Sequence, residues 1–222
     1  QSRFFRKDGK FFVETDGPDG KLATYEVKYT FGVDPLQQYL IEFPDGRLQA
    51  LSIAWDSRPK DKGGQRWFHL YPNENIRHDD VLHWTKLNQN WNFMCAECHS
   101  TGVQKNYDAA TDRFATKWAE ISVGCEACHG AGSRHVAWAQ DRKSWWPGSK
   151  QEDRTKGLVV QFDERAGTTW TQNDKTGMPQ RNGMPLGSRK EVETCGLCHA
   201  RRAQFSEKWV PGQPLANTHL PT

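Results

Sequence analysis

The sequence is poor in apolar residues for its length of 222 residues. Apolar side chains make up 36% of the chain, and the mean hydropathy is −0.86. No apolar run is long enough to form a transmembrane helix, because charged residues are spread along the whole sequence. We therefore expect no transmembrane segment, although the length is enough for one or two domains with a real core.

The sequence also has no excess of one charge sign. It has 30 Lys and Arg against 27 Asp and Glu, which gives a formal net charge of +3. No basic stripe with interleaved aromatic residues stands out, although such a stripe is usual on a nucleic-acid surface. The sequence therefore predicts no nucleic-acid partner.

No cysteine is left over, because all six fall into one repeated pattern. The pattern is C-x-x-C-H, at residues 95–99, 125–129 and 195–199. It is the attachment site of a c-type haem, in which two thiols add to the two vinyl groups of one porphyrin. The histidine after the second cysteine then becomes the proximal iron ligand. We expect three covalent c-type haems (iron protoporphyrin IX), with thioether bonds to Cys95, Cys98, Cys125, Cys128, Cys195 and Cys198 and proximal ligands His99, His129 and His199.

A zinc ribbon or a redox dithiol is the alternative meaning of C-x-x-C. A ribbon pairs two such turns, so three would leave one without a partner, and neither alternative explains a histidine after every second cysteine. Haem also fits the composition, since porphyrins supply apolar material and the ten Trp and eleven Phe can pack on flat rings. With its propionates and irons, the chain would carry about zero charge when oxidised and about −3 when reduced.

Turn residues and hydrophobic periodicity predict an α+β fold with two regions. Residues 1–65 read as an antiparallel β unit, because Asp-Gly turns separate runs of β-branched and aromatic residues. Residues 66–222 read as a mostly helical and coil trihaem c-type cytochrome region. In that region we expect helices over 79–92, 95–99, 133–145 and 188–205, the last opened by a capping box at Ser188 and Glu191. We also expect a β hairpin over 103–121 and a second small β element from residues 158–162 and 168–172.

Five histidines lie outside the motifs, and each iron needs a sixth ligand or keeps an open position. His135 follows His129 by six residues, so it stays on the same side of that haem and could reach a neighbouring one. His83 lies on the expected helix 79–92, and His69 lies in an aromatic strand. We expect the distal ligands to come from His83, His135, His69 and His219, and we expect His78 to be exposed.

One block resembles a known family. Residues 125–135 read C-E-A-C-H-G-A-G-S-R-H and resemble the C-E-x-C-H-G-x-G-S-x-H block of multihaem cytochromes similar to the tetrahaem cytochrome of ammonia oxidisers and its octahaem relatives. The neighbouring segments 67–72, 82–85, 90–94 and 198–204 resemble larger exported cytochromes that often carry tetratricopeptide repeats. The resemblance implies closely stacked haems, mostly with two histidine ligands, that pass single electrons. It also implies that the four distal candidates exceed three haems by one.

These patterns predict electron transfer by a multihaem c-type cytochrome module with three covalent, mostly bis-His haems, more a carrier than an enzyme. The alternative is a reductase or oxidase of small nitrogen or sulfur species with one open haem. A third possibility is a subunit that docks and wires a larger oxidoreductase through its β unit. A ferric spectrum separates the first two, because an open iron is high-spin.

The sequence also leads to expectations about location and partners. C-type haem is attached outside the cytoplasm, so we expect a periplasmic or extracellular location. The chain starts at Gln1 without a signal peptide, and we expect it to be a piece of a longer exported protein or complex with further haems. Its partners would be other redox proteins or cytochromes. His219 or His69 would then ligate a haem outside the three motifs.

Overall fold

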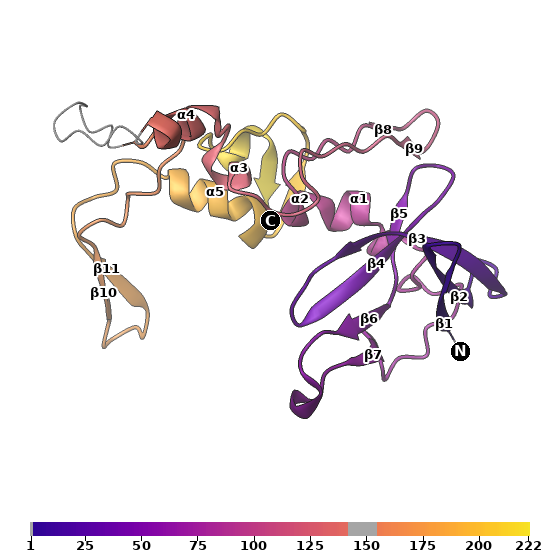
Figure 1. Ribbon diagram of the computed structural model, residues 1–222. Helices are drawn as coiled ribbons and strands as arrows, with labels where there is room; N and C mark the ends of the chain where they lie inside the picture. The colour runs from indigo at the N-terminus through magenta and orange to yellow at the C-terminus, as the bar shows by residue number, and fades with distance from the viewer. Residues whose placement is uncertain (1, 142–154) are drawn as a thin grey trace. The chain divides into compact units, whose positions relative to one another are not determined.

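The computed structural model describes residues 2–141 and 155–222, in two compact units, Gln1–Ser122 and Val123–Thr222. Figure 1 shows the elements of both units, coloured from indigo at the N-terminus to yellow at the C-terminus. Among the described residues, no helix combines the length and apolar character needed to span a membrane.

The N-terminal unit is built on one antiparallel sheet of seven strands. The strands are β1 (Arg3–Lys7), β2 (Lys10–Asp16), β3 (Leu22–Phe31), β4 (Leu36–Glu42), β5 (Leu48–Ala50), β6 (Ile53–Asp56) and β7 (Arg66–His69). Their order is β1-β2-β3-β4-β6-β7, and β5 also pairs with β4. This confirms the predicted fold class and its N-terminal β unit, although the sheet extends four residues past the expected end at residue 65.

The sheet follows from the turns and alternation that the sequence shows. Asp8 and Gly9 both have positive φ, 50° and 77°, as a tight two-residue hairpin turn between β1 and β2 requires. Along the second half of β3, partly buried and exposed residues alternate, so one face of the strand packs inward. The short 3₁₀ helix η1 (Lys60–Lys62) lies in the expected polar linker before β7.

The expected helix over 79–92 is wrong. The structure has successive turns, then η2 (Leu87–Gln89) and the short helix α1 (Trp91–Met94). The reason is tertiary: the buried amide of Gln49 donates to the carbonyl oxygens of Trp84 and Lys86, at 2.8 and 2.9 Å. These contacts hold the segment against β5 as a succession of turns, in which backbone bonds such as Gln89 N–H to the Lys86 carbonyl span three residues.

The first motif lies on α2 (Ala96–His99), directly after α1, as predicted. The expected hairpin over 103–121 is confirmed as β8 (Tyr107–Asp108) and β9 (Arg113–Phe114), extended by isolated bridges such as Gln104 with Lys117.

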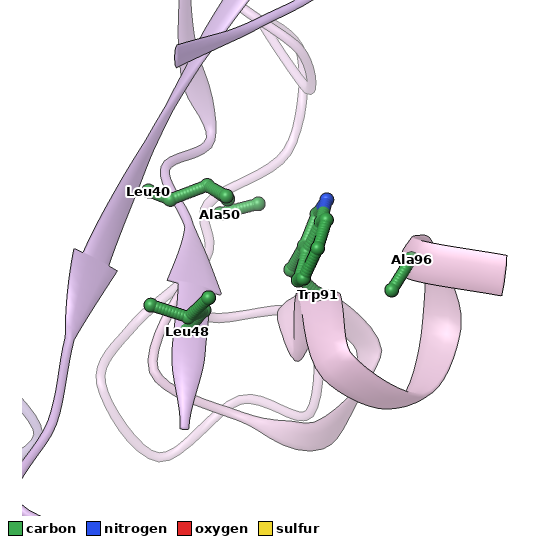
Figure 2. Close-up of a cluster of buried hydrophobic side chains, with 5 residues drawn as sticks. All are labelled: Leu40, Leu48, Ala50, Trp91 and Ala96. Carbon is green, nitrogen blue, oxygen red and sulfur yellow. The ribbon is translucent and has the colours of Figure 1, made fainter. Parts of the chain in front are cut away.

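Helix α1 is fixed to the sheet by one core cluster. Figure 2 shows Trp91 between the strand residues Leu40, Leu48 and Ala50 on one side and Ala96 of the first motif on the other. Trp91 and Ala96 have no exposed surface. Burying a side chain as large as Trp stabilises a fold by roughly 1.5–3 kcal/mol or more. The first motif is therefore part of the core of the β unit.

This packing explains where the two compact units divide. The sequence divides the chain functionally between 65 and 66, whereas the compact N-terminal unit continues to Ser122 and includes the first motif. The trihaem region 66–222 stays a functional prediction, which compactness does not test.

The C-terminal unit consists of short elements. They are α3 (Glu126–His129), α4 (Ser133–Asp141), β10 (Thr169–Gln172), β11 (Pro179–Asn182), α5 (Lys190–His199), β12 (Arg202–Gln204), η3 (Leu215–Asn217) and β13 (His219–Pro221). Strand pairs β10–β11 and β12–β13 are separate two-stranded sheets. The expected helix 133–145 is confirmed up to Asp141, and its remainder lies outside the described residues.

Three expectations for this unit need correction. The last helix ends at His199 instead of continuing to residue 205, because residues 202–204 pair with 219–221. Residues 158–162 form no strand, and β10 pairs with β11 instead. The capping box does not form, because Ser188 donates its hydroxyl to Glu164, which also accepts the backbone N–H of Glu191 at 3.3 Å. A carboxylate distant in sequence thus takes the place of the local cap.

Candidate haem sites

The first motif is held rigidly by buried polar contacts. The Asn90 side chain caps α1 by accepting the N–H of Phe93 at 3.0 Å. Asn92, fully buried, accepts the N–H of Leu48 at 2.6 Å and donates to Thr116 Oγ1 at 2.8 Å. Amide side chains with their polar atoms satisfied fix a single arrangement. The helical turn of the first motif is therefore positioned by the sheet that it packs on.

The two thiols of the first motif lie in a partly buried environment. Burial, followed by the proximity of Cys98, raises the pKa of the Cys95 thiol to about 11. Cys95 contacts the core cluster of Figure 2, and the ring of His99, which is exposed, lies edge-on to Phe31 at 6.0 Å. The free thiol at position 95 is thus protonated at neutral pH and weakly nucleophilic.

The second motif begins the block that the sequence singled out. Glu126 accepts the backbone N–H of Gly132 at 2.6 Å, which closes the three-residue loop 130–132 between α3 and α4. A side chain at Gly132 would place its Cβ 3.1 Å from that carboxylate oxygen. The E and the second G of the block therefore form one local contact.

The rings of His129 and His135 both bond to one neighbouring segment. His129 Nδ1 lies 2.9 Å from the carbonyl oxygen of Val160, and His135 Nδ1 lies 2.7 Å from that of Lys156. A carbonyl oxygen can only accept, so the proton of each ring must be on Nδ1. Each Nε2 then carries a bare lone pair, and no hydrogen bond within the described residues engages it. This is the tautomer in which imidazole binds a metal through Nε2.

Two other distal candidates, His69 and His83, have the opposite tautomer, with the ring proton on Nε2. The N–H of Tyr71 donates to His69 Nδ1 at 3.0 Å, so the His69 proton is on Nε2. His83, which is 2% exposed, donates from Nε2 to the Asp16 carboxylate at 2.8 Å. Its Nδ1 lies 2.8 Å from Thr85 Oγ1. Ligation through Nε2 would require either ring to exchange these hydrogen bonds.

The carboxyl of Asp16, which accepts from His83, has a lowered pKa. Burial opposes ionisation of Asp16, but hydrogen bonds from His83 and Thr15 outweigh it and lower the pKa of the Asp16 carboxyl. The backbone oxygen of Asp16 also accepts the indole N–H of Trp84 at 2.8 Å. His83 and Trp84 thus fasten the segment before η2 to the end of β2.

The third motif lies in the last two turns of α5, with Cys195, Cys198 and His199 exposed. Glu193 anchors the helix by accepting the N–H of Leu215 at 2.8 Å. A side chain at Gly196 would meet Leu215 Cδ2 at 3.0 Å, so this helix packs closely on η3.

The last distal candidate, His219, lies in β13. It is 1% exposed, and its Nδ1 lies 2.8 Å from Thr218 Oγ1. The segment around His219 is a paired strand, with β13 on β12. His78, expected to be exposed, is partly buried, and its ring lies over Gly20.

The thiols form no metal cluster of the zinc type. Across residues 2–141 and 155–222, no three His, Cys, Asp or Glu side chains lie close enough to hold a metal ion. All six cysteines lie in the described part of the chain, and they form no disulfide with one another. Burial and the nearby Cys195 both raise the pKa of Cys128, so the second and third motifs come near each other within the C-terminal unit.

The residues present fit covalently attached haem. Each motif has its two thiols on one helical turn and its histidine at the end of that turn. Large apolar side chains beside the motifs are about half exposed, as expected of surfaces that a flat apolar group would cover; they are Phe93, Met94, Val123 and Val192.

Comparison with known proteins supports the same chemistry for part of the chain. Residues 58–130 match the family model described as Cytochrome c554 and c-prime. The match contains the first two motifs and covers less than half of the chain. No curated protein and no solved structure matches the sequence. The matched part is similar to c-type cytochromes, which carry covalently bound haem and transfer electrons to redox partners.

Proposed function

We propose that this chain is an electron-transfer module of a multihaem c-type cytochrome with three covalently bound haems. The observation that carries the proposal is the state of His129: it ends a C-x-x-C-H turn, and its Nδ1 is bonded to a carbonyl, which leaves Nε2 as a ligand. When bound, c-type haem supplies a one-electron iron centre. The protein residues hold that centre, orient its ligands and limit the access of water.

The histidine states rank the distal candidates. His135 is ready to donate its Nε2 lone pair, and we assign it to a distal position. Because it follows His129 so closely, it serves a haem other than the one that His129 holds. His69, His83 and His219 are the candidates for the remaining distal positions, and His69 and His83 would have to give up hydrogen bonds described above.

Export and further haems belong to the same proposal. Attachment of c-type haem outside the cytoplasm supports a periplasmic or extracellular location. Four distal candidates for three haems support a further haem, in another segment or a partner cytochrome. His219 is buried in the β12–β13 pair, so the proposal of a further haem rests mainly on His69. His69 lines a small pocket of about 150 Å³ beside β6.

The reductase alternative has one observation in its favour. Among His69, His83 and His135, it is His135 whose proton is placed by a carbonyl so that Nε2 keeps its lone pair. An iron without a ready sixth ligand stays open, as substrate reduction requires.

A haem assay with a ferric spectrum tests the proposal. The pyridine haemochrome of the whole protein should give three haems per chain, and the haem should remain on the chain in a denaturing gel. Haem that extracts into acidified acetone would contradict covalent attachment. Low-spin ferric bands support the carrier, and a full equivalent of high-spin haem that turns over nitrite or sulfite supports the reductase.

A further inference from the structure

One short segment of the C-terminal unit, residues 155–160, contacts both ligand-ready histidines, and we call it the strap. It opens with a turn in which Lys156 and Gly157 have positive φ, 52° and 72°. The turn is closed by the N–H of Leu158 donating to the Thr155 carbonyl at 2.9 Å. Two successive residues with positive φ are the signature of a type I′ turn, which fixes where the Lys156 carbonyl points.

The far end of the strap is attached to His129 twice. The N–H of Val160 donates to the His129 carbonyl at 3.2 Å, while the His129 ring donates back to the Val160 carbonyl. Val160 is 2% exposed, and Phe162 lies 5.0 Å from the ring of His129. At one end of the strap the Lys156 carbonyl accepts from the His135 ring, and at the other end the Val160 carbonyl accepts from the His129 ring.

We infer that the strap is a positioning element that sets the tautomer and orientation of His129 and His135 together. This rests on the proposed function, in which the two histidines ligate two different irons. A partner that accepts the second N–H of a metal-bound histidine fixes the ring and raises its basicity. A displacement of the strap therefore changes the ligation of two irons at once.

Gly157 is the point at which the strap can be displaced. It passes so close to the start of α4 that an added Cβ would lie 2.5 Å from the Arg134 carbonyl oxygen and 2.9 Å from the His135 N atom. Both are backbone atoms, so a side chain there forces the strap and the helix apart. The contact lies next to the carbonyl that holds His135.

The chain offers a matched control. Gly167 has a φ of 70°, nearly that of Gly157, and an added Cβ there would meet nothing within 4 Å. Gly157→Ala and Gly167→Ala thus share the penalty of a side chain at positive φ, and only Gly157→Ala displaces the strap.

The test compares these variants as whole holoproteins with three haems confirmed by pyridine haemochrome. Loss of an outer partner of a metal-bound histidine weakens binding about 10- to 100-fold. We therefore expect Gly157→Ala to bind carbon monoxide at least about tenfold better when reduced, and to shift two reduction potentials. Gly167→Ala should keep the parent spectrum and potentials.

The outcomes separate the two hypotheses. If the parent lacks covalent haem, the proposed function fails. If haem is present and Gly157→Ala matches Gly167→Ala in spectrum, carbon monoxide binding and potentials, the strap inference is overturned. Should Gly157→Ala yield no holoprotein, Gly212→Ala replaces it, because its Cβ would press Val160 Cγ2 at 2.9 Å, a softer side-chain contact. It should shift the potential of the haem on His129 relative to Gly167→Ala, and the absence of that shift also overturns the inference.

Discussion

A hydrogen bond to one nitrogen of a histidine decides whether the other nitrogen can bind iron. His135 donates from Nδ1 to a carbonyl, whereas His83 donates from Nε2 to a carboxylate. The same residue type is thus ready for ligation at one position and engaged at another.

Replacing His135 with alanine should open one iron. The second and third motifs would keep their covalent haems, because no thioether bond is touched, but one ferric haem would become high-spin and its reduced form would bind carbon monoxide. Electron paramagnetic resonance and carbon monoxide difference spectra measure this. His78→Ala is the control and should keep the parent signals. An unchanged spectrum for His135→Ala would remove it from the ligand set.

Replacing His83 with alanine should destabilise the N-terminal unit, and the ferric spectrum of the variant shows whether His83 also ligates an iron. The substitution leaves the Asp16 carboxylate and the Thr85 hydroxyl without their partner, which costs roughly 1–3 kcal/mol. Thermal melting with parallel spectroscopy measures both effects. Asp16→Asn weakens the same contact without removing an imidazole. If His83→Ala opens an iron and Asp16→Asn does not, His83 is a distal ligand, as the sequence predicted.

At the scale of elements, packing determines which residues stand between the two cysteines of each motif. Ala96 is buried against Trp91, Glu126 accepts from Gly132, and Gly196 lies against Leu215. The haem attachment chemistry leaves these positions open. The residue types allowed at these positions are therefore restricted by the element that each helical turn packs on.

Enlarging Ala96 should disturb the core of Figure 2. Ala96→Leu would add three carbon atoms to a site with no exposed surface, and overpacking of this kind costs about 1–3 kcal/mol. Denaturant unfolding measures the loss. Ala139→Leu, the same change at an exposed position of α4, should alter stability by about 0.5 kcal/mol or less. Equal effects of the two substitutions would contradict the role of Ala96 in the core.

The loop between β6 and β7 should show a defined acid sensitivity. Arg58 bonds the Asp56 carboxylate through its guanidinium, at 2.7 and 3.0 Å, and through its backbone N–H, which lowers the pKa of Asp56 to about 2. A carboxyl whose pKa is lowered by folding stabilises the fold above its ordinary pKa near 4. That stability is lost as the pH falls from about 4 to about 2.

Asp56→Asn tests this assignment. The variant should melt at a lower temperature at pH 7 and should lose less stability than the parent between pH 4 and pH 2. Melting curves across this range give the measurement. Asp61→Asn removes an exposed carboxylate from the neighbouring η1 and should retain the acid-range loss. A parent-like pH profile in Asp56→Asn would contradict the role of the Asp56–Arg58 pair.

At the scale of the whole molecule, the two compact units divide the motifs unequally. The N-terminal unit holds one motif and the C-terminal unit holds two. A protease site inserted between Ser122 and Val123 should therefore release one fragment with one covalent haem and another with two. Haem staining and pyridine haemochrome of the separated fragments give the ratio. Any other distribution would show that a motif does not carry its haem.

The sequence alone predicted c-type haem chemistry at the motifs, and it determined the β unit. Both depend on contacts between near neighbours: two thiols and an imidazole on one helical turn, and Asp-Gly turns between alternating strands. The strands up to Asp56, the short helix of the first motif and the hairpin around residues 107–114 were predictable for this reason.

Only the tertiary structure decided the elements and histidines whose partners are remote in sequence. Gln49 binds two carbonyls of the segment 79–92, which was expected to be a helix. Residues 219–221 pair with residues 202–204, which were expected to end the last helix. The proton of His135 is placed by Lys156, and that of His83 by Asp16. Spacing shows that a histidine is present, but the acceptor that the fold brings to its ring decides which nitrogen is left for iron.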